Sequence, residues 1–344
     1  MPMHNGWLPR EGITADPVIR LLKRTAFNPV ATLLLILLAR YTKRGSDLAI
    51  LHETAFARIR KLFYFGLFRW VSGFLDSGVL NNWVKDEYHW EKEVVLVTGA
   101  SNVHYYKCDI TSPATIAKIA AEVRKDVGNP TIIINNAGVA RGKNILDATE
   151  KDVRFTFDVN TFAHYWLAKE FVPSMVQSNH GMIVIVASIA AFVTVPNMTD
   201  YAASKAAAHS FHEGLAAELK TRYNAPKVRT IIVNQGYTKT PLFEGFSNDA
   251  TFLNPPLEPE TVAEAIVKKV LSGSSGQVIL PEIGSNLTLF RGMPHWYQTT
   301  VRSKGEKMMK NWDGRQVIDV EKRGSGGEKE GESESTVLVP PVAK

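Results

Sequence analysis

The sequence predicts an α/β fold built on a doubly wound parallel sheet, and three observations in the middle of the chain support that prediction. First, short apolar runs alternate with longer segments in which apolar residues follow helical spacing. Second, the apolar runs show no polar alternation, which is typical of strands covered by helices on both faces. Third, polar turns follow the runs, and ligands of such sheets bind at the carboxyl ends of the strands.

The alternation extends over residues 93–281, which we interpret as one domain. The runs that we expect to form strands are 94–97, 131–134, 182–187, 228–233 and 277–280. The segments that we expect to form helices between them are 114–127, 147–178, 200–223 and 259–271. Pro173 should kink or end a turn of the second helix, because proline lacks a backbone donor and clashes with the preceding turn.

Residues 1–92 form a separate region that is apolar, aromatic and basic by turns. The run 30–39 is apolar and is flanked by basic residues on both sides, but it is shorter than the roughly 20 residues that a spanning helix needs. A second stretch, 62–84, is rich in aromatic residues, which suit a headgroup boundary, and basic amphipathic helices lie in that plane. We therefore expect a membrane-associating helical extension. The alternative is a helical hairpin packed on the main domain or on a partner subunit.

Composition excludes several classes of protein. The chain has 40 Lys and Arg residues against 34 Asp and Glu residues, a net charge of +6, and the basic excess is spread along the chain. A nucleic-acid role is therefore not expected, because such proteins cluster their basic residues. The single cysteine, Cys108, excludes an internal disulfide and a multi-cysteine zinc site, and we expect no metal.

The segments after the third apolar run supply candidate catalytic groups. Ser188 follows that run, and Tyr201 and Lys205 lie four residues apart on the expected helix 200–223. Residues four apart share one helix face, so the ammonium of Lys205 can lie near the phenol and lower its pKa from about 10. Tyr201 is thus a candidate general acid and base, and Ser188 could hydrogen-bond the same substrate oxygen. Asn160 is expected within a helix, where its amide would be satisfied by backbone or by water near the site.

In this order and at these strand ends, the motifs resemble the short-chain dehydrogenase/reductase family over about residues 93–281. The matching residues are Thr98, Gly99, the turn 135–138, Asn160, Ser188, Tyr201 and Lys205. The resemblance implies a Rossmann-like sheet, NAD or NADP as cofactor, and hydride transfer between the nicotinamide and an alcohol or carbonyl compound.

Roles for the catalytic residues follow from the resemblance. Tyr201 would exchange a proton with the substrate oxygen, which Ser188 would orient. Lys205 would lower the pKa of Tyr201 and bond the nicotinamide ribose, and Asn160 would hold a water of the proton relay. The residues expected to bind the cofactor are Thr98, Gly99, Ser101, Asp109, Asn136, Ala137, Gly138, Tyr201, Lys205, Gly236 and Thr240. The family's usual Pro-Gly is Gln235-Gly236 here, so the sequence departs from the family's pattern at that turn.

A finer resemblance connects the chain with the membrane-bound retinol dehydrogenase and hydroxysteroid dehydrogenase-like branch. It rests on the N-terminal region and on residues 105–109 and 195–200. It implies a lipophilic alcohol or ketone of retinoid, steroid or long-chain type, and association with the endoplasmic reticulum or a lipid droplet. In the family, the helices corresponding to 147–178 and 200–223 form the oligomer interface, so a homodimer through them is expected.

The C-terminal part of the chain divides into two segments. Residues 282–323 mix aromatic and basic residues. In the family this region shapes the substrate pocket or contacts the membrane, and a helix packed on the core is the alternative. Residues 324–344 are mostly polar and glycine-rich and are expected to be disordered.

The sheet is expected to be truncated near its first βαβ unit. The family fingerprint Thr-Gly-x-x-x-Gly-x-Gly should be followed by a helix, a strand and another helix, but Thr98 and Asp109 are only eleven positions apart. A βαβ unit takes about 30 residues or more, so most of the glycine motif and the second strand are missing, a deletion on the order of 30–40 residues. Residues 104–108 would either replace that strand beside 94–97 or pair irregularly. The alternative function is therefore a membrane-bound remnant that binds cofactor poorly, or an incomplete gene model, acting at most as an interaction partner.

Overall fold

A computed structural model of the chain describes residues 4, 6, 8–99, 105–243, 245–246, 251–309, 311–312, 314, 317–319 and 337–339. Contacts within the chain divide it into two units, Met1–Val84 and Lys85–Lys344. Each unit is described by itself below.

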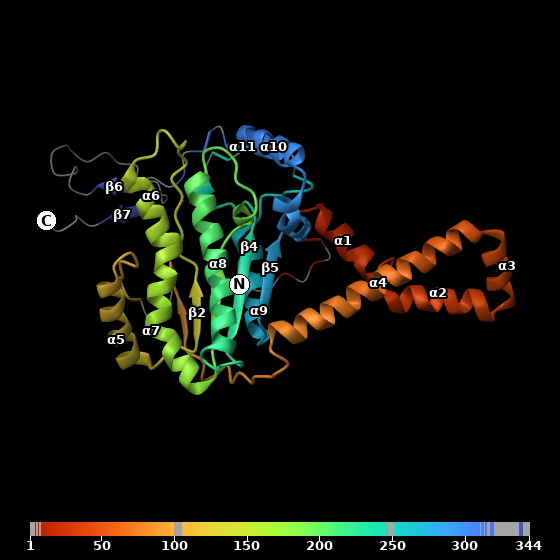
Figure 1. The fold of residues 1–344 in the computed structure, drawn as a ribbon, viewed down its shortest axis with the longest axis horizontal. Coiled ribbons are helices and arrows are strands. Elements are labelled where there is room, and N and C mark those ends of the chain that lie inside the picture. Colours follow the sequence, from red (N-terminus) through yellow and green to blue (C-terminus); the bar gives the residue numbers. More distant parts are fainter. Residues whose placement is uncertain are drawn as a thin grey trace. The chain divides into compact units, whose positions relative to one another are not determined.

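The first unit is helical (Figure 1). Its helices are α1 (Ala15–Arg24), α2 (Pro29–Tyr41), α3 (Lys43–Leu51) and α4 (Glu53–Leu80). The side chain of Asn28 accepts hydrogen bonds from the first free N–H groups of α2, and Thr42 does the same for α3, which explains where these helices begin. Helix α2 packs against α4, where Gly66 lies against the backbone of Phe27 and leaves no room for a larger residue. No single described helix is long and apolar enough to cross a membrane, whereas α1 and α2 together, bent by 46°, meet that test of length and composition.

The second unit is an α/β domain with a five-stranded parallel sheet, which confirms the fold class expected from the sequence. The strands are β1 (Val95–Val97), β2 (Ile132–Asn135), β3 (Met182–Val186), β4 (Arg229–Gln235) and β5 (Gly276–Leu280). They pair in chain order, with Ile132 beside Met182 and Met182 beside Arg229. Every strand begins and ends within two residues of its expected bounds, because long apolar side chains mark the buried runs.

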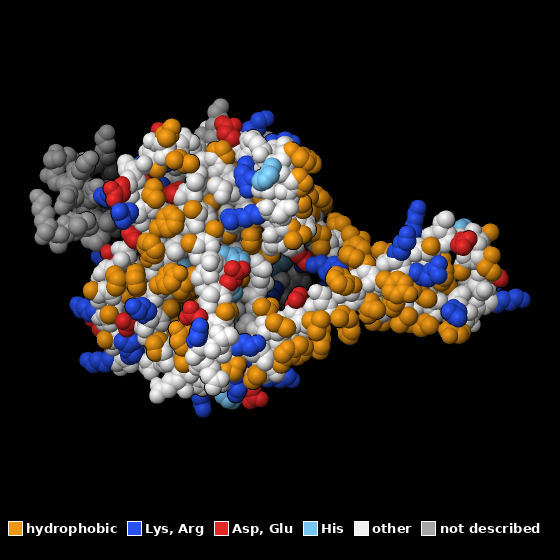
Figure 2. Space-filling view, viewed as in Figure 1, with side chains coloured by type: hydrophobic (Ala, Val, Ile, Leu, Met, Phe, Trp, Pro, Cys, Tyr) orange, Lys and Arg blue, Asp and Glu red, His pale blue; other side chains and the backbone are white. Residues whose placement is uncertain are grey.

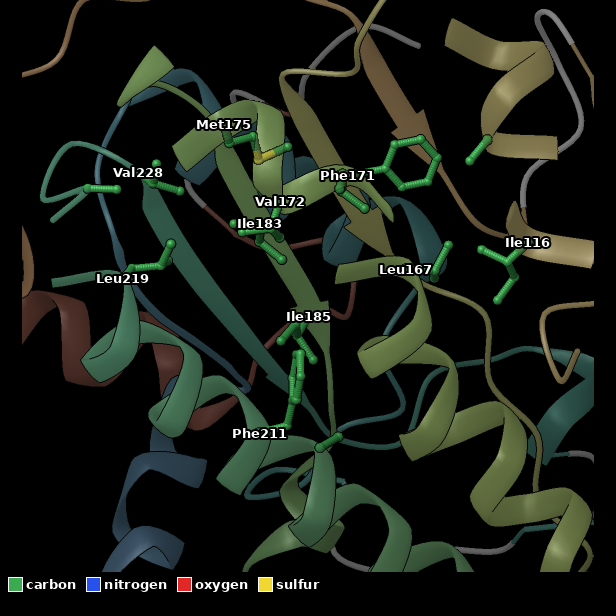
Figure 3. Close-up of a cluster of buried hydrophobic side chains, with 14 residues drawn as sticks. Ile116, Leu167, Phe171, Val172, Met175, Ile183, Ile185, Phe211, Leu219 and Val228 are labelled. Carbon is green, nitrogen blue, oxygen red and sulfur yellow. The ribbon is translucent and has the colours of Figure 1, made fainter. Parts of the chain in front are cut away.

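Helices pack on both faces of this sheet. They are α5 (Pro113–Val127), α6 (Glu150–Phe157), α7 (Ala163–Ser178), α8 (Thr199–Thr221) and α9 (Pro259–Leu271). Successive residues of a strand point to opposite faces. Ile183 and Ile185 therefore meet Phe171 and Phe211 in the cluster that α5, α7 and α8 form with the sheet (Figure 3), while Val184 on the other face packs in the cluster that contains α9.

The segment 147–178 is helical from Glu150 to Ser178, and the one departure from the expected helix is a π-helical turn inside it. Thr149 caps α6 through a reciprocal pair of hydrogen bonds with Asp152, and a π-helical turn, Asp158–Phe162, separates α6 from α7. Pro173 lies inside α7 without ending it, since the helix continues to Ser178.

Strand β1 is the edge of the sheet among the described residues, and its only partner there is β2. Val95 and Val97 are 49% and 38% exposed, which is unusual for a strand of a parallel sheet. We expected residues 104–108 either to replace a second strand beside β1 or to pair irregularly. Residues 105–109 form no strand, so the replacement is not found in the described part of this segment. The deletion itself stays a prediction.

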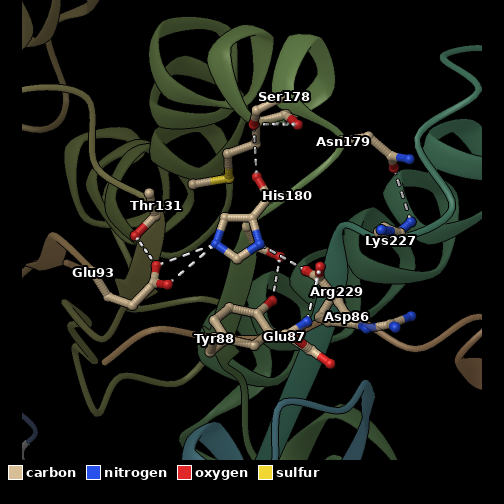
Figure 4. A network of polar contacts seen from close by, with 12 residues as sticks. Asp86, Glu87, Tyr88, Glu93, Thr131, Ser178, Asn179, His180, Lys227 and Arg229 are labelled. Carbon is tan, nitrogen blue, oxygen red and sulfur yellow. Dashed lines mark hydrogen bonds and ion pairs between the residues drawn. The ribbon is translucent and has the colours of Figure 1, made fainter. Parts of the chain in front are cut away.

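A polar cluster fastens the start of the second unit to the sheet (Figure 4). His180, just before β3, bonds Asp86 Oδ2 through Nδ1 at 2.8 Å and lies 3.2 Å from Glu93 Oε1 through Nε2. The Tyr88 hydroxyl donates to the Gly181 carbonyl, and Thr131 donates to Glu93. Thr131 and His180 precede β2 and β3, so they lie at the amino ends of these strands. The segment 85–93 is therefore held at the end of the sheet opposite to the carboxyl ends of the strands.

Beyond β5 the chain forms short helices and one further strand pair. The helices are the 3₁₀ segment η4 (Glu282–Gly292), α10 (His295–Lys304) and α11 (Glu306–Met309). Strands β6 (Val317–Asp319) and β7 (Val337–Val339) pair in parallel. Of the tail expected to be disordered, only 337–339 are described; the remainder of 324–344 lies outside the described residues.

Candidate active site

The polar turns at the carboxyl ends of β1, β2 and β4 converge, as the sequence predicts, around one cavity of about 640 Å³. Of the expected site residues, those that line it are Gly99, Asp109, Asn136, Ala137, Gly138, Tyr201, Lys205 and Thr240. Gly236 lies beside it, where a Cβ would come within 3.3 Å of the Leu280 carbonyl, so there is little room for a side chain at this turn. Ser101 lies outside the described residues.

Tyr201 is buried, with 3% of its surface exposed, and its side chain forms a hydrogen bond with Ser188. Ser188 is positioned at the end of β3, where its Oγ accepts from Ala190 N at 3.1 Å and donates to the Gln235 carbonyl at 3.3 Å. The serine and tyrosine oxygens therefore meet at one place, where both could bond a substrate oxygen.

Burial raises the pKa of Tyr201 to about 12, and the hydrogen bond with Ser188 opposes this only in part. The expectation that Lys205 lowers this pKa is not met in the described structure. Desolvation outweighs other effects here, and the Lys205 Nζ lies 5.8 Å from the centre of the tyrosine ring.

Lys205 is equally buried, one helical turn after Tyr201 on α8. Its Nζ donates to the Val186 carbonyl at the end of β3, at 2.9 Å. An ammonium has three donors, so two remain for a molecule in the cavity. Burial lowers the pKa of Lys205 to about 8, which leaves it mostly charged at neutral pH.

Asn160 is fully buried in the π-helical turn between α6 and α7. Its Oδ1 accepts from Val139 N at 2.9 Å, and its Nδ2 donates to the Val139 carbonyl at 2.8 Å and to Ser204 Oγ at 3.0 Å. We expected this amide to bond either backbone groups or water, and the structure shows bonds to backbone groups. Asn160 thus holds the loop after β2 against α8, and a relay water stays a prediction.

Two glycines bring backbone close to the cavity. Gly99 has φ +74°, and a Cβ on it would lie 3.3 Å from Ala137 Cα. A Cβ on Gly138 would lie 3.4 Å from Lys205 Nζ and 3.5 Å from Asn160 Oδ1. The hydroxyl of Thr98 accepts the N–H groups of residues 136 and 137, both at 3.0 Å, so this threonine shapes the turn instead of facing a ligand.

Several cavity residues were missed by sequence reasoning. Helix α9 contributes the apolar side chains of Val262 and Ile266 to the cavity wall. Helical spacing predicts that these two residues share a helix face, but it does not predict that this face borders the cavity. Leu242 and Phe243, after β4, form another part of the wall. The aromatic spacing of residues 237–246 was the available signal.

A buried tyrosine, lysine and serine at the carboxyl ends of a parallel sheet define a class of oxidoreductase that exchanges a proton through tyrosine. A sequence profile described as short chain dehydrogenase matches residues 85–251. Dehydrogenase RED2 of Cochliobolus heterostrophus is 38% identical over 198 residues, 47% of this chain and 75% of that protein. The chain belongs to the short-chain dehydrogenase family, whose members are NAD(P)-dependent oxidoreductases.

Two other relatives have more specific names. Epidermal retinol dehydrogenase 2 of Mus musculus is 36% identical over 192 residues, 56% of this chain and 61% of that protein. The 17-beta-hydroxysteroid dehydrogenase 13 of Mus musculus is 34% identical over 194 residues, 55% of this chain and 61% of that protein. The chain thus spans about three fifths of the length of these two relatives.

The residues present fit the nicotinamide end of the family's cofactor. Gly138 leaves open the space beside Lys205 Nζ, and the two unused donors of that ammonium suit ribose hydroxyls. The buried side-chain amide of Asn234 has no hydrogen-bond partner among the described residues, and its neighbour Gln235 lines the same cavity. The pyrophosphate end differs, because only nine residues, 100–108, connect Gly99 with Asp109, too few for a helix and a strand.

Proposed function

We propose that this chain interconverts a lipophilic alcohol and its carbonyl compound with a nicotinamide cofactor. The observation that carries the proposal is the hydrogen-bonded pair of Ser188 and Tyr201 beside Lys205, buried at the end of one cavity. When bound, the nicotinamide supplies the hydride donor or acceptor. The cofactor is NAD or NADP, and the segment that would read the ribose 2′ position follows Gly99 in this fold.

In the reducing direction, Tyr201 donates its hydroxyl proton to the carbonyl oxygen that Ser188 orients. In the oxidising direction, the same oxygen takes the proton from the alcohol. The ammonium of Lys205 stabilises the negative charge that develops on the tyrosine oxygen, and the low polarity of the site strengthens this attraction. Asn160 keeps the loop after β2 in place against the catalytic helix.

The cavity wall supports an apolar substrate. The apolar side chains of Phe155, Val159, Leu242 and Phe243 line it. The names of the retinol and hydroxysteroid dehydrogenases among the relatives agree with this substrate class.

Membrane association, at the endoplasmic reticulum or a lipid droplet, is the second part of the proposal. On α2 and α4 large apolar side chains are exposed to an extent that is rare on soluble monomers; they include Val30, Leu34, Leu38, Phe65, Phe68, Trp70 and Phe74. Figure 2 shows these helices as a mainly hydrophobic surface with Lys and Arg side chains between. Such a surface suits the boundary between lipid headgroups and acyl chains.

A homodimer through α7 and α8 is the third part. A groove between these helices is lined by Tyr165, Val172, Phe211, Leu215 and Tyr223, and the two tyrosines are nearly half exposed. A second copy of the same helices could cover it.

The function is tested by incubating the full-length chain with NADH or NADPH and 2-acetonaphthone, an apolar aromatic ketone, and measuring the alcohol formed. We expect turnover with one of the two cofactors and a loss of at least a hundredfold in Tyr201→Phe. Absence of turnover with both cofactors and with a panel of retinoid, steroid and long-chain substrates would refute the proposal.

A second candidate is a chain that pairs with full-length relatives but binds cofactor poorly. The exposed Val95 and Val97 on the edge strand favour it, since in a complete sheet neighbouring elements cover such residues. Isothermal titration of the chain with NADH and NADPH distinguishes the two candidates. Micromolar binding of either cofactor would exclude this one.

A further inference from the structure

Residues 305–309, 311–312 and 314 contact the loops that follow β2, β3 and β4, and we call these residues the strap. Gly305 packs against Val195, in the loop after β3, so closely that a larger residue would not fit. Met309 accepts a hydrogen bond from Asn197 Nδ2 of the same loop at 3.2 Å. Gly314 lies against the loop after β2, where its Cβ would come within 2.6 Å of the Ala140 carbonyl.

The middle of the strap holds the loop after β4. Gly245 lies so close to the Asn311 carbonyl that a side chain is excluded. Trp312 is only 1% exposed, and its indole N–H donates to the Leu242 carbonyl at 2.9 Å. The strap therefore touches loops that follow three different strands, and all three border the site.

Trp312 acts on the cavity through one aromatic contact. Its ring stacks on Phe243 with ring centres 5.6 Å apart and planes 13° apart. Phe243 in turn meets the Tyr201 ring edge-on at 6.1 Å, and it forms part of the cavity wall beside that tyrosine. Trp312 itself is not among the residues that line the cavity.

We infer that Trp312 is a positioning residue for the apolar body of the substrate. It keeps the Phe243 ring edge-on to the Tyr201 ring. It thereby fixes the part of the cavity wall on which a flat, apolar ketone lies while its oxygen reaches Ser188. This inference rests on the proposed function. Truncating Trp312 leaves a space under Phe243 into which that ring can rotate, and the wall is lost although no catalytic group has changed.

The test measures binding of 2-acetonaphthone to the full-length chain in one detergent by isothermal titration, without turnover. We expect Trp312→Ala to raise the dissociation constant at least tenfold and Trp312→Phe, which keeps a stacked ring, to remain within threefold of the wild type. Phe290→Ala is the matched control, because Phe290 is an equally buried aromatic residue of the C-terminal segment that does not line the cavity. It should also stay within threefold.

Each contrary result overturns the inference. Unchanged binding in Trp312→Ala, equal weakening in Phe290→Ala, failure of Trp312→Phe to restore binding, or no binding by the wild type would each refute it. If Trp312→Ala does not fold, Trp312→Leu is a smaller truncation that still removes the ring stacked on Phe243, and it should weaken binding at least fivefold. A wild type that binds the ketone but reduces it with neither NADH nor NADPH contradicts the proposed function and leaves the positioning role intact.

Discussion

Replacing Lys205 with methionine should stabilise the fold at neutral pH while abolishing activity. The side chains are similar in length, so the core packing is kept, but the buried ammonium is removed. A pKa lowered from 10.5 to about 8 means that burial costs the charged form about 3 kcal/mol, at about 1.4 kcal/mol for each tenfold change in proton affinity. Losing the hydrogen bond to the Val186 carbonyl takes back about 1 kcal/mol. The net gain at pH 7 is therefore about 2 kcal/mol.

The sign of the pH dependence follows from the direction of the shift. Below pH 8 the lysine is charged in both the folded and the unfolded chain, so the full cost is present. Between pH 8 and 10.5 the folded chain loses its proton first, and the cost declines towards zero above that range. The wild type should therefore approach and then overtake Lys205→Met in stability as pH rises from 7 to 10.

Urea unfolding of both proteins at pH 7, 8.5 and 10 measures this difference directly. Activity with 2-acetonaphthone should fall by at least two orders of magnitude in the variant, because the charge that stabilises the tyrosine oxygen is gone. A variant less stable than the wild type at pH 7, or a difference that does not change with pH, would refute the burial argument.

Three further predictions concern other parts of the molecule. Gly138→Ala should reduce turnover at least tenfold with an unchanged circular dichroism spectrum, because its Cβ would fill the space beside Lys205 Nζ in which we propose that the nicotinamide ribose binds; full activity would contradict that placement of the ribose. Asn160→Ala should lower the free energy of unfolding by about 2–4 kcal/mol, since the Val139 backbone groups lose their partners; urea unfolding that shows less than 1 kcal/mol would count against this role. Phe68→Asp should weaken flotation with phosphatidylserine vesicles at least fivefold, and the control Ile145→Asp, at an equally exposed position in the catalytic unit, should not.

The strands and the catalytic turns could be predicted because both depend on local sequence. An apolar run such as 182–187 specifies a buried strand, and the polar residue that ends it lies at the site whatever the details of packing. The π-helical turn at Asn160 could not be predicted, since it depends on an amide that bonds Val139, twenty-one positions away. The raised pKa of Tyr201 was missed because spacing along a helix gives proximity to Lys205 but not the loss of water.

Contacts between residues that are far apart in the sequence were the features that the sequence could least predict. Trp312 reaches the site through Phe243, and nothing in either residue's neighbourhood indicates the pairing. The exposed edge of β1, in contrast, agrees with the short segment between Gly99 and Asp109, because a missing neighbour leaves a strand uncovered.

Transfer of deuterium tests the central claim most directly. The full-length chain is incubated with 2-acetonaphthone and with NADH or NADPH that carries deuterium at both C4 positions, and the alcohol is analysed by mass spectrometry. The account predicts one deuterium per alcohol molecule with the wild type and at least a hundredfold less labelled product with Tyr201→Phe. No labelled alcohol from the wild type with either cofactor, or equal labelling by the Tyr201→Phe variant, would contradict it.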